Sequence, residues 1–286
     1  MKIAIASGKG GTGKTTVATN LACVLAKNNI KVTYIDCDVE EPNGHLFLKP
    51  NFNAKQQVFT PIPKVDESKC NGCGLCAKIC QYSAIICLVK KAMVFPELCH
   101  GCGGCIKVCP ENALMESKKK IGIIESGTIN KISFIHGKLD IGVAMSPPLI
   151  RQVKNQQISD AIVIIDAPPG TSCPVITSVQ GVDYILLVTE PTPFGLNDLG
   201  LAIDMVKELK IQFGVVVNRH EKDNTKAREY CSSKKAKILT EIPDDRRVAE
   251  AYSFGNIASL TINGYSSLFQ DLWEKIEYYK NHVKEN

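Results

Sequence analysis

The segment Gly8–Thr15 reads GKGGTGKT, and it decides the fold. It follows a short apolar run at residues 2–6 and precedes a helical pattern from Thr15 to about Lys27. The spacing G-x-x-x-x-G-K-[ST] between a strand and a helix predicts a phosphate-binding loop, because glycines let backbone N–H groups turn toward phosphate oxygens. We therefore expect ATP or GTP to bind at this loop.

Each part of the loop has an expected task. Lys14 is expected to reach the β- and γ-phosphates, and the Thr15 hydroxyl is expected to ligate Mg²⁺. Thr16 is placed to contact the α-phosphate side of the nucleotide. The other residues of the loop that are expected to contact the nucleotide are Gly8, Gly10, Gly11, Thr12 and Gly13.

Further short apolar runs predict the strands of a sheet. A second strand is expected at residues 32–36, and others at 162–166, 185–188 and 213–217. Short β-branched runs that alternate with helical patterns are typical of parallel strands covered by helices on both faces. The expected fold is an α/β P-loop NTPase with a mostly parallel sheet flanked by helices.

Acidic residues follow two of these strands. The run Ile162–Asp166 is an apolar strand that ends in an aspartate, which is a Walker B arrangement, and Asp166 is expected to hold Mg²⁺ through water. Asp36 and Asp38 follow the second strand. Taken alone, an acidic pair at a strand end is also compatible with a helix cap.

Together these motifs resemble the MinD/ParA family, over nearly all of the chain outside one insertion. From Lys9 the loop reads K-G-G-x-G-K-T-T, and the run from Asp166 to Gly170 is similar to the family's D-x-P-P-G second switch. The resemblance implies a homodimer that sandwiches the nucleotide, in which Lys9 reaches the partner's nucleotide and neutralises charge during γ-phosphate transfer. A solvated loop lysine is the alternative interpretation of Lys9.

The resemblance also assigns roles to single residues. Asp38 would position the attacking water, Asp36 would support Mg²⁺ or its loop, and the Gly170 N–H would meet the γ-phosphate. Two late segments, 217–219 and 242–244, are similar to those with which the family recognises the base. The expected base-site residues are Asn218, Arg219, Pro243 and Asp244.

Residues 69–117 contain nine of the chain's 13 cysteines, and eight of the nine form two runs. The spacing C-x₂-C-x₂-C-x₃-C occurs twice, and each cysteine of the first run recurs 29 positions later. In two-cluster ferredoxins with this spacing, the fourth cysteine of each run ligates the other cluster. The expected ligands of two [4Fe–4S] clusters are Cys70, Cys73, Cys76 and Cys109 for the first, and Cys99, Cys102, Cys105 and Cys80 for the second.

The two runs resemble those of bacterial ferredoxins, with one departure. Pro110 follows the second run, whereas Gln81 follows the first, which leaves ligation in place and alters only the surroundings of the cluster. Zinc is the competing interpretation, and the repeat of two such runs argues against it. The expected domains are a discontinuous ATPase domain, 1–64 and 119–286, and an inserted α+β ferredoxin-type domain, 65–118.

The other five cysteines carry weaker signals. Cys23, Cys37 and Cys87 are expected to be small buried side chains, and Cys231 is expected at the surface. Cys173 lies seven residues after Asp166. The nitrogenase iron protein binds a shared cluster through a cysteine near this place, but such a cluster needs a second cysteine, and a plain residue at a helix start is the simpler interpretation.

Composition and pattern limit the location and the partners. The net charge of +5 is too mild to indicate nucleic acid, and no apolar run approaches the roughly 18 to 20 residues of a membrane span. The N-terminus has no signal-peptide pattern, so we expect a cytoplasmic protein, in which clustered cysteines favour metal. MinD proteins end in a membrane-binding helix, but the last apolar face here, at residues 268–276, is expected to pack on the sheet.

The combination predicts an iron–sulfur ATPase. Our first hypothesis is MgATP-gated electron transfer through two [4Fe–4S] clusters to a docked redox protein, which is similar in logic to the nitrogenase iron protein. The alternative is an ATPase that assembles or carries iron–sulfur clusters or metallocofactors, similar to the Mrp-type proteins. A positioning protein similar to MinD ranks third, because it leaves the cysteines unexplained.

Overall fold

The computed structural model describes residues 1–156 and 161–282. It divides into two compact units: unit 1 comprises residues 1–55, 124–138 and 149–286, and unit 2 comprises residues 56–123 and 139–148. Unit 2 therefore contains the expected insertion and also takes in short flanking segments. The predicted ATPase range 119–286 includes residues 157–160 and 283–286, which lie outside the described residues.

Unit 1 is built on a sheet whose strands are mostly parallel. The strands are β1 (Lys2–Ala6), β2 (Val32–Asp36), β3 (Asn51–Val65), β6 (Leu114–Ile129), β7 (Ile132–Leu139), β8 (Ile162–Asp166), β9 (Tyr184–Thr189), β10 (Phe213–His220) and β11 (Ile238–Pro243). Their order across the sheet is β11-β10-β9-β1-β8-β2-β7-β6-β3. Neighbours from β11 to β7 pair in parallel, and β3 and β6 continue into unit 2.

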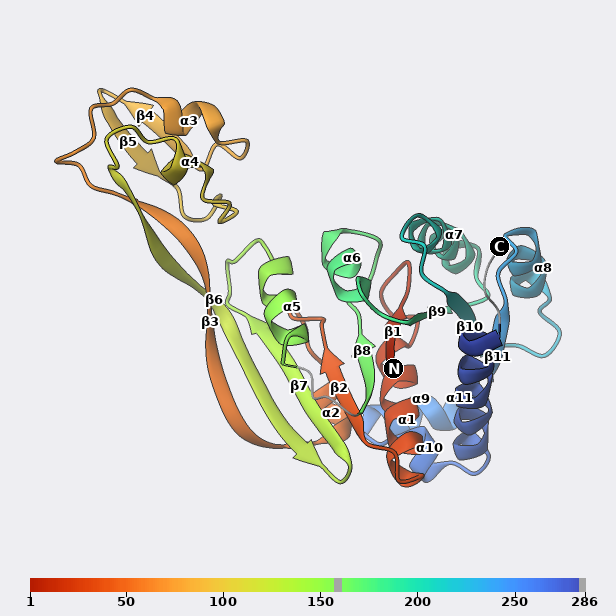
Figure 1. The fold of residues 1–286 in the computed structure, drawn as a ribbon. Coiled ribbons are helices and arrows are strands. Elements are labelled where there is room, and N and C mark those ends of the chain that lie inside the picture. The colour runs from red at the N-terminus through yellow and green to blue at the C-terminus, as the bar shows by residue number, and fades with distance from the viewer. Residues whose placement is uncertain (157–160, 283–286) are drawn as a thin grey trace. The chain divides into compact units, whose positions relative to one another are not determined.

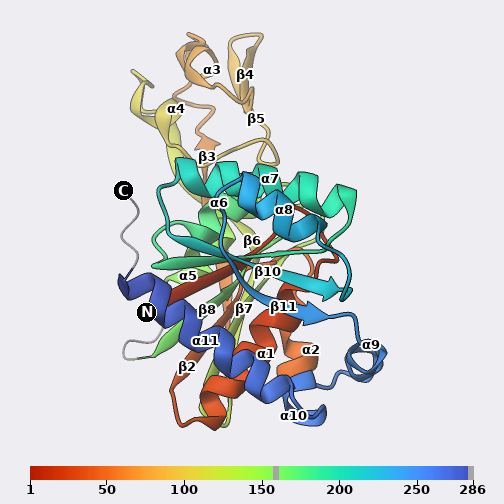
Figure 2. The ribbon, with the colours of Figure 1, turned by 90° about the vertical axis from the view of Figure 1, so that its right-hand side faces the viewer.

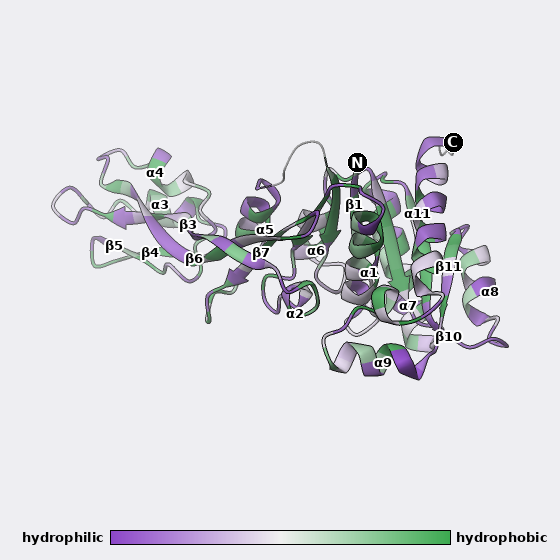
Figure 3. Ribbon diagram, turned by 90° about the horizontal axis from the view of Figure 1, so that it is seen from below, coloured by the Kyte–Doolittle hydropathy of each residue, from purple (hydrophilic) through white to green (hydrophobic). Residues whose placement is uncertain are grey.

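Helices cover both faces of this sheet (Figures 1 and 2). One face carries α5 (Pro147–Lys154), α6 (Cys173–Val179), α7 (Pro193–Glu208) and α8 (Lys226–Ser233). The other carries α1 (Lys14–Lys27), α2 (Gly44–Leu48), α9 (Arg246–Ser253), α10 (Ala258–Thr261) and α11 (Tyr265–His282). The strands between the two layers are mainly hydrophobic, whereas polar residues gather on outer helices such as α8 and α9 (Figure 3).

The strands that the apolar runs predict are confirmed. β1, β2 and β8 have the expected bounds, and β9 and β10 extend slightly beyond theirs. Ile3, Ile164 and Leu186 on these strands have no exposed surface, as expected where helices cover both faces of a parallel sheet. The prediction of an α/β P-loop fold with a mostly parallel sheet is therefore correct.

The final helix α11 packs into the core of unit 1. Phe269, Leu272 and Ile276 are almost fully buried and belong to the same apolar cluster as Leu21 and Leu25 of α1. The expectation that this amphipathic face packs inside the protein is confirmed. Among residues 1–156 and 161–282, no helix combines the length and apolarity that a membrane span requires.

Four strands of the sheet were not predicted, namely β3, β6, β7 and β11. Residues 41–64 have no apolar periodicity, yet they form α2 and most of β3. The basic stretch 118–120 lies inside β6, and β7 follows at once. The first seven residues of β3, which lies at one edge of the sheet, are exposed, so its sequence shows no buried face that a pattern could reveal.

Unit 2 is small and internally repeated. It contains α3 (Leu75–Ile79), β4 (Ile85–Leu88), β5 (Lys91–Val94) and α4 (Gly104–Lys107), and β4 pairs with β5 in an antiparallel hairpin. The 29-residue repeat is also present in the backbone, because Gly72 and Gly74 adopt positive φ and so do Gly101 and Gly103. The small core of this unit includes Cys76, Ile85, Cys105 and Leu114.

One buried titratable group of unit 1 predicts acid sensitivity. The His136 ring is buried on β7, and its Nε2 atom lies 3.2 Å from Oε2 of Glu125. Burial lowers the pKa of His136 to about 4, although the hydrogen bond to Glu125 opposes the change. Burial raises the pKa of Glu125, but hydrogen bonds from Lys55 and His136 outweigh it and bring that pKa to about 2.

We expect the free energy of unfolding to fall as the pH drops from about 6.5 to about 4. In this window the unfolded chain binds a proton at His136 that the folded chain does not, which costs about 3 kcal/mol in full. The variant His136→Phe, whose ring would lie beside Phe52 and Phe134, should lose much of this dependence. Urea unfolding at pH 7 and pH 4.5, followed by the fluorescence of Trp273, measures it. Equal acid losses in both proteins would contradict the assignment.

Candidate nucleotide site and cysteine cavities

The phosphate loop joins β1 to α1 in a conformation that depends on glycine. Gly11 and Gly13 adopt φ values of 78° and 93°, in the left-handed region that disfavours side chains. A Cβ atom on Gly13 would lie 2.3 Å from Nδ2 of Asn218. That Nδ2 atom donates a hydrogen bond of 2.8 Å to the Thr12 carbonyl, so the predicted base-site residue Asn218 is fixed against the loop.

A cavity of about 490 Å³ lies over the loop in unit 1. Among the predicted residues, the structure brings together at this cavity Gly10, Gly11, Gly13, Lys14, Thr15, Thr16, Asp38, Asn218, Arg219, Pro243 and Asp244. Gly8, Lys9, Thr12, Asp36, Asp166 and Gly170 are not among the described residues that line it. The phosphate loop, Asp38 of the predicted first switch and residues of both predicted base segments therefore meet at one cavity.

Several lining residues were missed by the sequence analysis. Val248, Ala249 and Tyr252 of α9 line the cavity, as do Glu41 and Asn43. Tyr252 adds an aromatic ring to the lining, and this ring lies 4.5 Å from that of Phe47 on α2. These positions carry no motif, because only the folding of α9 back toward the loop brings them to the cavity.

Gly170, the predicted γ-phosphate contact, is engaged elsewhere. Its N–H donates a hydrogen bond of 3.0 Å to the carbonyl of Ser7. Its neighbour Pro169 lines the cavity instead. The Gly170 N–H can therefore contact a phosphate, as predicted, only after it gives up its hydrogen bond to the Ser7 carbonyl.

Two aspartates end adjacent strands beneath the loop. Asp36 and Asp166 are partners in the register of β2 and β8, and each is only 1% exposed. The Asp36 carboxylate accepts the backbone N–H groups of Asp38, at 3.1 Å, and Gly44, at 2.9 Å. Oδ2 of Asp166 accepts the hydroxyl of Tyr34 at 2.9 Å. Within the described part of the chain, Oδ1 of Asp166 has no hydrogen-bond partner.

The charges around this pair are strongly coupled. Burial raises the pKa of Asp36, and the neighbouring Asp166 raises it further. Burial also raises the pKa of Asp166, although the nearby hydroxyls of Thr15 and Tyr34 oppose this. Burial lowers the pKa of Lys14, while Asp166 and Asp38 oppose the change. A buried carboxylate oxygen without a partner, beside the Thr15 hydroxyl, fits a hard divalent cation such as Mg²⁺.

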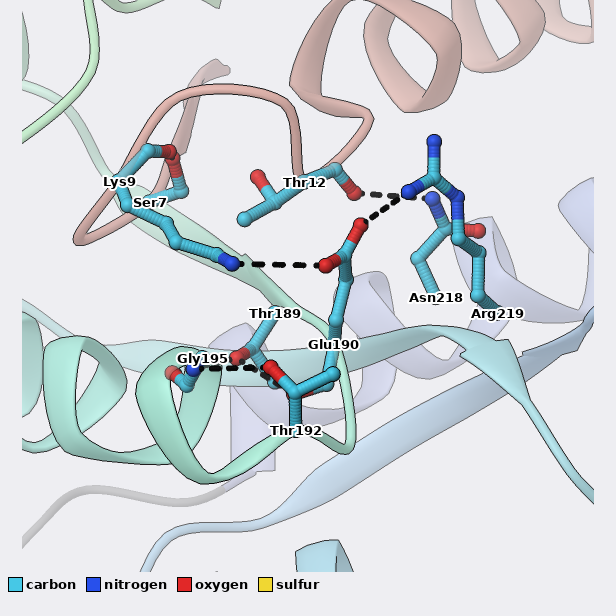
Figure 4. Close-up of polar contacts among 9 residues, drawn as sticks. All are labelled: Ser7, Lys9, Thr12, Thr189, Glu190, Thr192, Gly195, Asn218 and Arg219. Carbon is cyan, nitrogen blue, oxygen red and sulfur yellow. Dashed lines mark hydrogen bonds and ion pairs between the residues drawn. The ribbon is translucent and has the colours of Figure 1, made fainter.

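Glu190 links two of the predicted site residues, and it was also missed (Figure 4). One carboxylate oxygen lies 2.6 Å from the guanidinium of Arg219, and the other lies 3.5 Å from Nζ of Lys9. Glu190 is 8% exposed at the end of β9, next to the cap of α7, where Thr192 accepts the Gly195 N–H. In the described chain, Lys9 is therefore paired within its own subunit and is not a free loop lysine.

In unit 2, the eight cysteines of the two runs surround two cavities. The first is lined by Cys70, Cys73, Cys76 and Cys109, together with Cys87. The second is lined by Cys80, Cys99, Cys102 and Cys105. Each cavity thus receives three cysteines of one run and the last cysteine of the other, which is the grouping that the spacing predicts. Cluster binding at these cavities stays a prediction.

The surroundings of these thiols fit iron–sulfur clusters. Backbone N–H groups point at sulfur, with Gly101 N at 3.5 Å from Sγ of Cys99 and Ala113 N at 3.3 Å from Sγ of Cys109. Such bonds stabilise sulfur that carries negative charge. Over the described ranges, no group of three or more His, Cys, Asp or Glu side chains is spaced to hold a single metal ion.

The remaining cysteines divide into three kinds. Cys37 is fully buried as expected, and Cys23 is partly buried against the core. The expectation for Cys231 was wrong: it is 1% exposed on the inner face of α8, and burial raises its pKa to about 11. Cys173 is exposed at the first residue of α6. Cys87 is only half-buried, because it borders the first cavity.

Comparison with known proteins agrees with this geometry. Residues 3–258 match the CobQ/CobB/MinD/ParA nucleotide binding domain. An uncharacterized protein of Methanocaldococcus jannaschii is 32% identical over 280 residues, which is 97% of this chain and 96% of that protein. An iron-sulfur cluster carrier protein of Pyrococcus horikoshii is 27% identical over 224 residues, 76% of this chain and 60% of that protein. The septum site-determining protein MinD complexed with Mg-ADP, also from Pyrococcus horikoshii, has the same fold, with a TM-score of 0.62 at 19% identity and 99% of each chain covered.

We expect the substitution Glu190→Gln to tighten ATP binding by about threefold to tenfold, or about 0.7–1.4 kcal/mol. It removes a buried negative charge that holds Lys9 and Arg219 and opposes the approach of a triphosphate. Titration with a fluorescent ATP analogue measures the affinity. The matched control is Glu208→Gln, an exposed position at the end of α7. Unchanged or weaker binding by Glu190→Gln would show that Glu190 does not compete with the nucleotide for these cations.

Proposed function

Because the chain belongs to the CobQ/CobB/MinD/ParA nucleotide-binding family and is a P-loop ATPase of the MinD/ParA type, we propose that it uses MgATP to control electron transfer through two [4Fe–4S] clusters to a partner protein. The observation that carries the proposal is the pair of cysteine-lined cavities in unit 2. Eight thiols in two complete sets suit clusters that stay bound while electrons pass through them.

At the nucleotide site, the residues divide the work by charge. Lys14 and the loop N–H groups bind the phosphates, while Thr15 and the free oxygen of Asp166 hold Mg²⁺. The metal supplies positive charge to the β- and γ-phosphates. Asp38 lines the cavity, and burial, with Asp166 next, raises its pKa to about 6. At neutral pH it is still mainly ionised, so it accepts a proton of the attacking water in a hydrogen bond.

The proposed active form is a homodimer. Lys9 exchanges the carboxylate of Glu190 for the nucleotide of the partner subunit, where its charge is needed during γ-phosphate transfer. Asn218, Arg219, Pro243 and Asp244 bind the base at the other end of the cavity. These assignments rest on the shared cavity and on the family resemblance of the motifs.

A continuous stretch of chain leads from the nucleotide site of unit 1 into unit 2. Asp36 holds the segment from Asp38 to Gly44 through two backbone hydrogen bonds. α2 begins at Gly44, and β3 follows it and continues into unit 2. A rearrangement of the first switch when the γ-phosphate leaves would therefore act on the segment that leads directly to the clusters.

A second candidate function is that of a cluster carrier. The relative from Pyrococcus horikoshii named as an iron-sulfur cluster carrier protein favours it. One cysteine of each predicted set, Cys73 and Cys102, is exposed, so thiols of a recipient protein could reach the irons there. In this function the nucleotide would control release of a cluster and not of an electron.

One anaerobic experiment separates the two functions. Reduced protein is mixed with a low-potential redox acceptor, or with an apo-ferredoxin, in the presence of MgATP, MgADP or no nucleotide. Electron transfer predicts that the clusters reoxidise with MgATP only and keep their iron. Transfer of intact clusters to the apo-ferredoxin, with reoxidation that ignores nucleotide, would reject electron transfer and establish the carrier. Protein without iron would reject both.

We expect Lys9→Ala to bind ATP within about threefold of the original protein but to hydrolyse it at least about 100-fold more slowly. The proposed role of Lys9 lies in the transition state, where an arginine finger is worth 10³–10⁵ in rate. Phosphate release and equilibrium binding give the two quantities, and Lys222→Ala, an exposed lysine outside the site, is the control. Hydrolysis at the original rate would show that Lys9 takes no part in γ-phosphate transfer.

A further inference from the structure

The first cysteine cavity has a fifth thiol. Cys87, on β4, lines this cavity together with the four predicted ligands. Its Sγ atom lies 3.3 Å from the carbonyl oxygen of Gly72, to which the thiol donates. On the other side, a Cβ atom built on Gly74 would lie 4.0 Å from the Cβ atom of Cys87. Cys87 therefore contacts the ligand loop at Gly72 and lies near Gly74, so it borders the loop on both sides of Cys73.

The strand pairing explains how Cys87 reaches this place. Ile85, two residues earlier on β4, belongs to the small core of unit 2. Cys87 pairs with Ala92 of β5, and Ala92 lines the same cavity. Residues two apart on a strand share a face, so Ile85 and Cys87 both face the loop that carries the predicted ligands.

The internal repeat shows that this thiol is specific to one site. The position 29 residues after Cys87 is Glu116, and Glu116 lines the second cavity. The repeat thus places a side chain that can ligate iron beside each cavity, a thiol in the first and a carboxylate in the second. Outside this pair, the two runs match cysteine for cysteine.

We propose that Cys87 is a reserve ligand of the first cluster, which binds iron in place of Cys73. The inference rests on the proposed function, because that function supplies the clusters. Cys73 is the ligand concerned because it is exposed and lies between Gly72, whose carbonyl accepts the Cys87 thiol, and Gly74, which lies near Cys87. An exposed thiolate is the one most open to oxidation or to attack by another thiol.

The exchange balances without an added reactant. The bond from iron to the sulfur of Cys73 breaks, and a bond from the same iron to the sulfur of Cys87 forms. The proton of the Cys87 thiol passes to the departing Cys73 sulfur, and no atom changes oxidation state. The first site can therefore release Cys73 without losing iron. The second site has only the carboxylate of Glu116, a harder ligand, at the position that corresponds to Cys87.

The test compares ligand variants of the full chain after anaerobic reconstitution. The original protein and Cys87→Ser should each hold about eight irons, as two cubanes require. Cys73→Ser should keep both four-iron clusters, because Cys87 replaces the lost thiol. The double variant Cys73→Ser/Cys87→Ser should lose the four-iron cluster of the first site. Iron and acid-labile sulfide per chain, together with electron paramagnetic resonance, give the result.

The repeat supplies a matched control. Cys102 is the counterpart of Cys73 in the second run. In a Glu116→Gln background, Cys102→Ser should lose the four-iron cluster of the second site. Cys102→Ser with Glu116→Cys, which transplants the reserve thiol, should keep it. Loss of cluster in the transplant as complete as in the Glu116→Gln background would count against the geometry proposed for Cys87.

A second measurement separates ligation from a structural role. In the reconstituted original protein, Cys87 is a free, half-buried thiol and should react slowly with iodoacetamide. In reconstituted Cys73→Ser it binds iron and should not react. Mass spectrometry measures the alkylation of Cys87 in both proteins. Equal iron content in Cys73→Ser and Cys73→Ser/Cys87→Ser, with Cys87 alkylated as fast in Cys73→Ser as in the original protein, would overturn the inference and leave the proposed function intact. Absence of two clusters from the original protein would instead overturn the proposed function.

Discussion

The buried pair of carboxylates at the ends of β2 and β8 is the constraint on which the rest of the site depends. Asp36 and Asp166 lie side by side in the register of two parallel strands, almost without solvent. Burying a charged group is costly unless it is paired, so each carboxylate draws donors toward it. Asp36 fixes the first switch through two backbone N–H groups, and Asp166 keeps one oxygen free for a cation beside the phosphate loop.

Glu190 is a further buried carboxylate of the site, and it pairs with two cationic side chains. Lys9 and Arg219 lie far apart in the sequence, yet one nearly buried carboxylate holds both (Figure 4). A carboxylate shared by two cations at the rim of an anion site keeps them ordered and lowers the positive potential that a phosphate would otherwise meet. Under the proposed function, the two aspartates would help to hold a cation, and Glu190 would release Lys9 to the nucleotide of the partner subunit.

The sequence predicted the parts of this protein whose side chains face a core or follow a fixed chemical spacing. β1, β2 and β8 were recognisable because burial on both faces demands apolar runs, and the glycine loop because Gly13 leaves no room for a side chain. β3 was missed because an exposed edge strand needs no apolar pattern. Glu190 and Tyr252 were missed because only tertiary folding brings them to the site, and Cys231 was misplaced because the inner face of α8 was not foreseen.

The two cavities of unit 2 share one repeated backbone frame but are lined by different side chains. The cysteines and positive-φ glycines match across 29 residues, so the two cavities have the same frame. Their linings differ: Asn71, Glu111 and Cys87 border the first, whereas the stacked rings of Tyr82 and His100 border the second, beside Glu116. A carboxylate borders each cavity, Glu111 the first and Glu116 the second, and each predicted set has one exposed cysteine, Cys73 or Cys102. Under the proposed function, the two clusters would therefore differ through the Cys87 thiol beside the first and the stacked rings of Tyr82 and His100 beside the second.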